Sequence, residues 1–322
     1  MALFKRGLTH PQAVVLMVVV TLLWSIAGVV SRHLESARAF EVTFWRSASN
    51  ALALGLLLAW LKGPRALLAS LRHGGATLWW SGACWTVMFT AFMVAMSLTT
   101  VANVLITMSL APLFTALIAR VFLGHRLATR TWIAIVVAGA GIAWMYAAEV
   151  AGGDARHLQG TLVALSVPVA GATMWRLLQA QARRQAAGRA GGDGDMTPGV
   201  LLGAIGSSLI TLPLSVPFQA SAHDIGLLAM LGVVQLAVPC VLAVAAGKVL
   251  KAPEASLLGL LEILFGVAWT WLGSSESPTP AVIGGGSLVI AALAANELIA
   301  LRQREGARSG AAAGDETAPP LA

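Results

Sequence analysis

Glu262 is a carboxylate near the middle of an apolar stretch that runs from Pro253 to Leu272. The stretch has 20 residues, enough to cross the hydrocarbon core of a bilayer as a helix. A charge at the bilayer centre costs from about 3 to more than about 10 kcal/mol, so such a residue usually faces a bundle interior or a wet cavity. Glu262 could bind a cationic or amino group of a substrate, or carry a coupling proton. The alternative is a structural carboxyl group, either protonated or hydrogen-bonded to a neighbouring helix.

Arg46 is the second charged residue placed within an apolar stretch, about six residues after its start at Phe40. Its guanidinium group could meet a substrate carboxylate, or pair with Glu262 from another helix. The alternative is an arginine whose side chain extends to the membrane rim and is neutralised there by Glu41.

Polar and aromatic side chains inside the apolar stretches complete the set of candidates. Tryptophans at the ends of such stretches are typical of an interfacial belt, whereas deeper ones could line a cavity and stack on an organic substrate. The candidate substrate-binding residues are Glu262, Arg46, Trp24, Trp85, Trp175, Trp269, Gln235 and Asn50.

Other chemistries find little support in these residues. The six histidines lie at the edges of the apolar stretches, which argues against a buried haem or metal site. Cys84 and Cys240 lie within apolar stretches, and we expect them to be small apolar side chains of the core. The sequence contains no Walker-type phosphate-binding motif. We therefore expect no catalytic residues, cofactor or metal, although an intramembrane enzyme and a non-transporting membrane scaffold remain alternatives.

The chain that carries these residues is too apolar for a water-soluble domain. It is 57% hydrophobic and 11% charged, with a mean hydropathy of +0.80, whereas soluble domains contain about 25% charged residues. The sequence predicts an all-α polytopic membrane protein in a lipid bilayer, with ten transmembrane helices. Their approximate ranges are 13–30, 40–60, 76–96, 102–121, 131–150, 160–178, 198–217, 225–246, 253–272 and 280–300.

The distribution of positive charge predicts the orientation. Fifteen Lys and Arg residues fall at the termini and in the loops on one side, and only Arg32, Arg38 and Arg156 fall in loops on the other. By the positive-inside rule, we expect both termini to be cytoplasmic. We also expect a multi-pass protein of the plasma membrane, such as a bacterial inner membrane. The formal net charge of +7 follows from these loops and does not indicate nucleic-acid binding.

The ten helices divide into two halves. We expect a cytoplasmic N-terminus at 1–12, a first five-helix repeat at 13–150, a second at 151–300 and a disordered cytoplasmic tail at 301–322. Residues 182–196 are expected to form a flexible cytoplasmic loop. A shift of 151 residues places Leu113-Phe114 on Leu264-Phe265, and a repeat with an odd number of helices must be inverted in the membrane. Inverted repeats commonly place a substrate site near the midplane, where the two halves meet.

The order of several short motifs resembles the drug/metabolite transporter superfamily, in its ten-helix EamA-type branch, over most of residues 13–300. The matching residues are Trp24-Ser25, Arg46, the run from Ala95 to Ala102, the run from Ala111 to Leu117, the run from Ala255 to Leu258, Leu261-Glu262 and the run from Gly273 to Glu276. The resemblance implies two inverted five-helix repeats around a central cavity, and a secondary transporter, often an exporter, of small metabolites such as amino acids or drug-like amines.

The sequence departs from this pattern at the centre of the membrane. The proline that follows the helix-9 acid in the family is Ile263 here, and the first half keeps Pro112 but has Ala111 in place of an acid. The glutamate expected near the end of the fourth helix is His125, and it is retained only in the second half, as Glu276. We therefore expect one central carboxylate, Glu262, with protons as a possible coupling ion.

Overall fold

The computed structural model of the chain describes residues 8–111, 113–115, 117–118, 129–151, 155–187, 195–250, 252–273 and 279–315. All the regular elements in these ranges are helices. They are α2 (His10–Ser31), α3 (Ala39–Lys62), α4 (Pro64–Arg72), α5 (Ala76–Leu98), α6 (Val101–Met108), α8 (Thr129–Ala151), α9 (Ala155–Ala186), α10 (Thr197–Ser215), α11 (Ala222–Met230), the π-helix η1 (Leu231–Ala237), α12 (Val238–Ala246), α13 (Ala252–Gly273) and α14 (Pro280–Asp315).

The helices overlap the ranges expected from the sequence, and most begin and end within a few residues of them. Six are long and apolar enough to cross a membrane: His10–Ser31, Phe40–Lys62, Ala76–Leu98, Ala155–Gln185, Thr197–Ser215 and Ala222–Ala246. Shorter apolar helices cover Val101–Thr115, Leu261–Gly273 and Ile283–Asn296. The count of ten spans stays a prediction, and Pro112, His125 and Glu276 lie outside the described residues.

Two segments predicted to be irregular are partly helical. α9 continues to Ala186, into the expected loop at 182–196, and α14 continues to Asp315, through much of the expected tail at 301–322. The reason is local: these stretches are rich in Ala and Arg, which have high helix propensity and extend a helix that packing has already nucleated.

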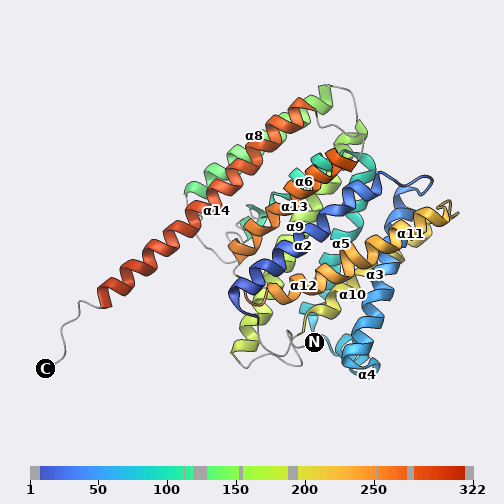
Figure 1. Ribbon diagram of the computed structural model, residues 1–322, viewed down its shortest axis with the longest axis horizontal. Coiled ribbons are helices and arrows are strands. Elements are labelled where there is room, and N and C mark those ends of the chain that lie inside the picture. The colour runs from blue at the N-terminus through green and yellow to red at the C-terminus, as the bar shows by residue number, and fades with distance from the viewer. Residues whose placement is uncertain are drawn as a thin grey trace.

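The helices form one bundle with a helix pair at its edge. In Figure 1, α8 and α14 lie side by side along one edge, and α14 runs out beyond the other helices towards the C-terminus. Within the bundle, α2 packs on α12 and α13, α3 on α10 and η1, and α5 on α9 and α10. α6 lies against α9 and α13.

Small residues allow α5 and α10 to approach closely. A Cβ atom at Gly203 would lie 2.2 Å from Cβ of Trp85, and one at Gly206 would lie 2.5 Å from Oγ1 of Thr86. Gly199 and Gly203 form a GxxxG pattern in the sequence, and the structure shows both glycines facing α5. Hydroxyl groups add bonds across the same region, since Ser207 Oγ lies 2.9 Å from both Ser47 Oγ and Thr90 Oγ1.

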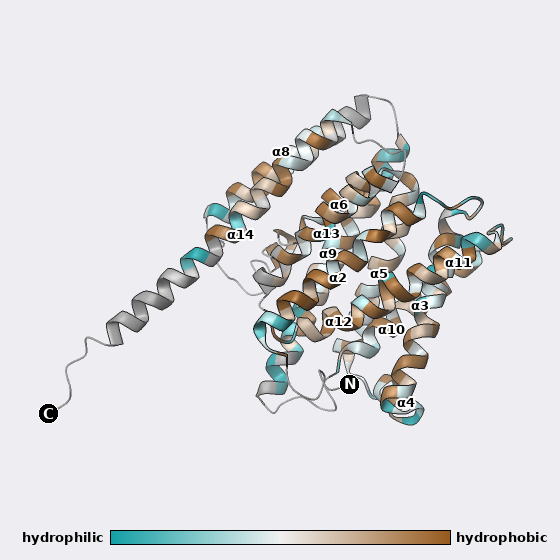
Figure 2. Ribbon diagram, in the orientation of Figure 1, coloured by the Kyte–Doolittle hydropathy of each residue, from teal (hydrophilic) through white to brown (hydrophobic). Residues whose placement is uncertain are grey.

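The hydropathy of the surface fits a lipid environment. Hydrophobic residues dominate the helices, and hydrophilic residues gather at helix ends and in connecting segments (Figure 2). Tryptophans near helix ends are exposed, as an interfacial belt requires: Trp60, Trp79, Trp80, Trp132, Trp144 and Trp271.

Candidate functional site

A cavity of about 80 Å³ lies among α2, α3, α5, α6, α9, η1, α12 and α13. Polar and charged side chains share it with aromatic rings and methionines. The lining residues are Trp24, Arg46, Trp85, Met88, Phe89, Phe92, Met108, Val167, Gln235, Leu236, Cys240 and Glu262. The volume is enough for several water molecules or part of a small organic ligand.

Arg46 brings a positive charge into the cavity from α3. Its side chain is only 2% exposed, Nε donates a hydrogen bond to Gln235 Oε1 at 3.2 Å, and Cζ lies 5.3 Å from the centroid of the Phe92 ring. No carboxylate among the described residues lies within 4 Å of its nitrogens. A guanidinium group has five N–H donors, so donors remain to bind an anionic group in the cavity.

Gln235 holds Arg46 in place. Its Oε1 accepts from Arg46, and its Nε2 donates to the carbonyl oxygen of Trp24 in α2 at 3.1 Å. One side chain thus connects α2, η1 and α3. Because its single acceptor atom is used by Nε of Arg46, Gln235 fixes the direction in which the rest of the guanidinium group points.

The π-helix that carries Gln235 follows from a proline. Pro239 has no N–H to donate to the carbonyl of Gln235, four residues earlier, and its ring would clash with that carbonyl in an α-helix. The chain takes the wider π register over Leu231–Ala237 instead, a geometry often found at functional sites. Gly232 lets this segment meet α3, because a Cβ there would lie 2.5 Å from the carbonyl oxygen of Arg46.

Glu262 contributes the carboxylate from α13. Its side chain is half-buried and faces the same cavity as Arg46. Within the described part of the chain it makes neither a hydrogen bond nor an ion pair. One turn later, Gly266 brings α13 close to α6, since a Cβ there would lie 2.4 Å from Leu105 Cδ1. The carboxylate is therefore available to a ligand or a proton.

The remaining wall is aromatic and sulfur-rich. The rings of Trp85 and Phe89 lie 5.3 Å apart, and the buried indole N–H of Trp85 has no acceptor among the described residues. Met88 and Met108 line the same space. Aromatic and thioether side chains adapt to apolar and aromatic groups, and the free indole N–H could donate to a polar one.

Five of the eight residues expected from the sequence meet in this cavity: Glu262, Arg46, Trp24, Trp85 and Gln235. The other three do not line it. Trp269 is 39% exposed, because it lies on an outward-facing part of α13. Trp175 packs on Gly247. Asn50 is fully buried beside the close contact of Gly232 with α3, and neither amide atom has a partner among the described residues.

The alternative role for Arg46 at the membrane rim does not fit the contacts. Glu41 accepts hydrogen bonds from the backbone N–H groups of Gln219 and Ala220, and Arg46 bonds to Gln235 instead.

Sequence reasoning missed the apolar lining, which comprises Met88, Phe89, Phe92, Met108, Val167, Leu236 and Cys240. Apolar residues in an apolar helix carry no signal that separates a cavity wall from a lipid-facing surface.

No group of three or more His, Cys, Asp or Glu residues that could hold a metal ion occurs in the described ranges. Cys84 and Cys240 are buried free thiols. What the arrangement offers is binding: a cation and a carboxylate within one partly apolar enclosure.

Several membrane-length apolar helices around a largely apolar cavity with a few polar and charged side chains define a multi-pass membrane protein. Residues 11–147 match the model of the EamA-like transporter family, which confirms the resemblance to the drug/metabolite transporter superfamily and indicates a membrane transporter. No curated protein matches the sequence. A solved structure described only as the crystal structure of a protein is similar in fold, with a TM-score of 0.59 and 18% identity over 92% of this chain and 99% of the other.

Proposed function

We propose that this protein is a secondary transporter, an exporter of small organic metabolites, that works by alternating access to the cavity. The observation that carries the proposal is that Arg46 of α3 and Glu262 of α13 line one cavity together with aromatic side chains. The two residues come from opposite halves of the sequence. A motion of one half against the other would therefore change the distance between Arg46 and Glu262.

The charges favour substrates with both an acidic and a basic group. Arg46 has N–H donors left for a carboxylate, and Glu262, which has no partner among the residues that the structure describes, could bind an ammonium group. The aromatic and methionine wall suits an apolar side chain. Amino acids fit this description, whereas drug-like amines would use Glu262 but would be repelled by an unneutralised Arg46.

The helix contacts support two inverted five-helix repeats. Number the ten predicted helices in chain order, so that 1 to 5 are α2, α3, α5, α6 and α8. Helices 6 to 10 are then α9, α10, α11–α12 with η1, α13 and α14. A repeat of five helices would exchange helix 1 with 6, 2 with 7, 3 with 8, 4 with 9 and 5 with 10. Helix pairs 2–7, 4–9 and 5–10 are in contact, and this exchange leaves each of these pairs unchanged. Contacts 3–6 and 3–7 likewise become 8–1 and 8–2, which are also present, and the family match ends at residue 147, near the proposed boundary at 150.

Proton coupling through Glu262 completes the proposal. With no nucleotide-binding motif in the sequence, an ion gradient is the natural energy source. A carboxyl group that faces the cavity and lacks a partner within the described residues can exchange a proton and a cationic ligand. In proteoliposomes, Glu262→Gln should abolish the effect of an imposed pH gradient on uptake. Full gradient-driven uptake by this variant would exclude coupling through Glu262.

The binding site itself is tested by a thermal-shift screen of the purified protein against amino acids, amines, nucleosides and drugs. A hydrogen bond to a charged group contributes about 1.5–3 kcal/mol, so Glu262→Gln should weaken a zwitterionic hit about 10- to 100-fold. Arg65→Gln is the matched control, because it removes an exposed charge on α4, away from the cavity. Hits that bind equally to wild type and Glu262→Gln would contradict the proposed site.

A further inference from the structure

Two buried carboxylates tie together two loops at one end of the bundle. Asp224, in the first turn of α11, is 0% exposed and accepts from the backbone N–H groups of Glu35, Ser36 and Ala37 at 2.8–2.9 Å. It also accepts from the hydroxyl group of Ser36 at 3.0 Å. The α2–α3 loop thus binds the carboxylate of Asp224, which lies just after the α10–α11 loop.

The second carboxylate makes the reciprocal contact. Glu41, in the first turn of α3, is 0% exposed and accepts from the backbone N–H groups of Gln219 and Ala220 at 2.8–3.0 Å. Arg38 adds a hydrogen bond to the carbonyl oxygen of Pro217. The α2–α3 loop therefore binds Asp224, at the start of α11, and the α10–α11 loop binds Glu41, at the start of α3. We call these contacts of Glu41 and Asp224 the latch.

Aromatic rings connect the latch to the cavity. Phe44 and Trp45 of α3 pack with Phe218 of the other loop, with ring centroids 5.1–5.4 Å apart. The indole N–H of Trp45 donates to Glu41 at 3.4 Å. The next residue, Arg46, lines the cavity. Release of the latch would therefore free the segment of α3 that carries the cavity cation.

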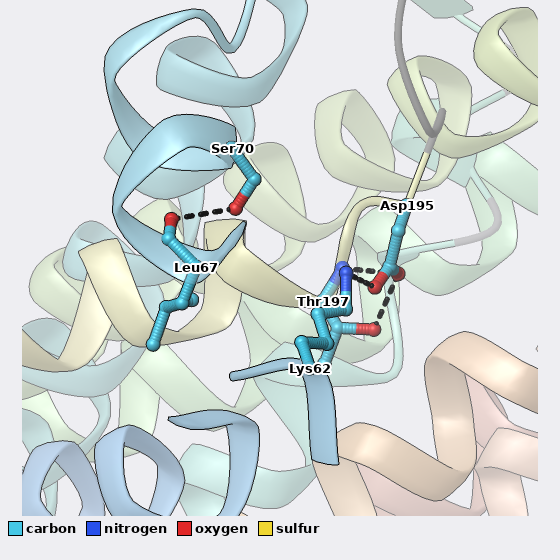
Figure 3. Close-up of polar contacts among 5 residues, drawn as sticks. All are labelled: Lys62, Leu67, Ser70, Asp195 and Thr197. Atoms are coloured by element: carbon cyan, nitrogen blue, oxygen red, sulfur yellow. Dashed lines mark hydrogen bonds and ion pairs between the residues drawn. The ribbon is translucent and has the colours of Figure 1, made fainter. Parts of the chain in front are cut away.

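The other end of the α3–α10 pair is closed by a much weaker contact. Lys62, the last residue of α3, pairs with Asp195, which precedes α10, at 2.5 Å (Figure 3). These side chains are 23% and 19% exposed. Lys62 follows Glu41 by 21 residues, about 32 Å along a helix, or about the thickness of the hydrocarbon core.

We propose that the latch is the gate at one end of the transport cavity, and that the Lys62 end opens more readily. The inference rests on the proposed function, because only a transporter must open its two ends in turn. Charge-assisted bonds from several backbone donors to a buried carboxylate are strong, whereas ion pairs near the surface contribute little. If both termini are cytoplasmic, the latch faces outwards, and the cavity loads from the cytoplasm, as an exporter requires.

The test uses Cys240 as a reporter, because this buried thiol lines the cavity. Cys84→Ser removes the other thiol. A membrane-impermeant maleimide is applied to one face at a time of oriented proteoliposomes. The double variant Glu41→Gln/Asp224→Asn should raise Cys240 labelling from the latch face at least tenfold, and Asp195→Asn should raise labelling from the opposite face only. Labelling from the latch face that is unchanged in the folded double variant would overturn the proposal.

A disulfide staple tests the latch while both carboxylates and their backbone N–H donors are kept. The backbone N–H of Ser221 donates to Ser36 Oγ at 3.2 Å, so cysteines at these positions lie close enough to be tested for crosslinking. The oxidised Ser36→Cys/Ser221→Cys protein should show at least tenfold slower labelling of Cys240 from the latch face, restored by reduction. Equal labelling before and after reduction would overturn the gate.

These labelling measurements need no substrate, which separates this proposal from the proposed function. If labelling follows the latch but no ligand depends on Arg46 or Glu262, the transport site is wrong and the gate stands. If ligand binding requires both residues but the rate of Cys240 labelling is the same in wild type and in the latch variants, only the proposed gate is wrong.

Discussion

At the scale of residues, the site depends on how Arg46 is neutralised. A buried guanidinium group normally pairs with a carboxylate, yet Arg46 bonds to a neutral amide and lies over the Phe92 ring. Glu262 faces the same cavity without closing the pair. We propose that these two groups, which do not pair with each other, form a site for a ligand that carries both an acidic and a basic group.

Gln235 is expected to act through Arg46 and not on the ligand directly. Gln235→Leu removes the acceptor for Nε, so the guanidinium group loses its fixed direction. Affinity for an amino-acid ligand should fall about 10- to 100-fold, the equivalent of one lost bond to a charged group. The fall should be larger for the amino acid than for the corresponding amine, as measured by thermal shift. Equal losses for both ligands would assign Gln235 a purely structural role.

Asp195 makes stability depend on pH at the end of α3. Burial alone would raise the pKa of this carboxyl group. Hydrogen bonds from Lys62 and Thr197 lower the pKa by more than burial raises it, so the pKa lies below its usual value of 3.8. The ionised form is favoured in the folded state, and its stabilisation is complete above about pH 5 and is lost as the pH falls through the folded-state pKa.

We therefore expect Asp195→Asn to lower the free energy of unfolding by about 1 kcal/mol between pH 5 and 8. The difference from wild type should shrink as the pH falls from 3.8 through the lower folded-state pKa, because Asp195 then becomes neutral in wild type as well. Denaturant unfolding in detergent at several pH values measures it. A difference that grows towards low pH would refute the assigned role of the ion pair.

At the scale of elements, close helix packing depends on single glycines. Gly203→Ala should destabilise the protein by about 1–3 kcal/mol, because its Cβ would overlap the Cβ of Trp85 and force α5 and α10 apart. Gly139→Ala in α8 is the matched control, since its Cβ would meet no atom within 4 Å. Its stability should be unchanged or raised by up to about 1 kcal/mol. Equal effects of the two substitutions on the melting temperature would contradict this account of the interface.

The π-helix should trade stability for function. Pro239→Ala restores an N–H that can bond to the carbonyl of Gln235, so an α register can replace the π register of η1. The melting temperature should stay the same or rise, while ligand affinity falls severalfold as Gln235 turns away from Arg46. Unchanged affinity in a protein with a raised melting temperature would show that the π register does not serve the site.

The sequence is informative where physics leaves few choices. Long apolar stretches must be helices in a membrane, and charges inside them must face polar surroundings, which is why the residue types alone point to Arg46 and Glu262. The sequence does not reveal which face of an apolar helix meets the cavity, so it missed Phe92 and Met88 and included Trp269, which does not line the cavity. The latch is also hidden, because Glu41 and Asp224 resemble ordinary helix-end acids whose acceptor role depends on loops distant in sequence.

At the scale of the whole molecule, the helix contacts fit two related halves whose chemistry has diverged. Arg46 belongs to the first half, and Glu262 and Gln235 belong to the second. The two ends of the bundle also differ, with the buried carboxylates Glu41 and Asp224 at one end and the partly exposed ion pair of Lys62 and Asp195 at the other. In the transporter that we propose, this difference between the two ends would set the direction of transport.

The most direct test of the central claim is a comparison of three related ligands by thermal shift. These are the amino acid that stabilises the protein most, its decarboxylated amine and its deaminated acid. Wild type should bind the amino acid at least tenfold more tightly than either analogue. Arg46→Gln should lose the preference over the amine, and Glu262→Gln should lose the preference over the acid. Equal binding of all three ligands by wild type, or preferences that survive both substitutions, would contradict the claim that Arg46 and Glu262 form one site.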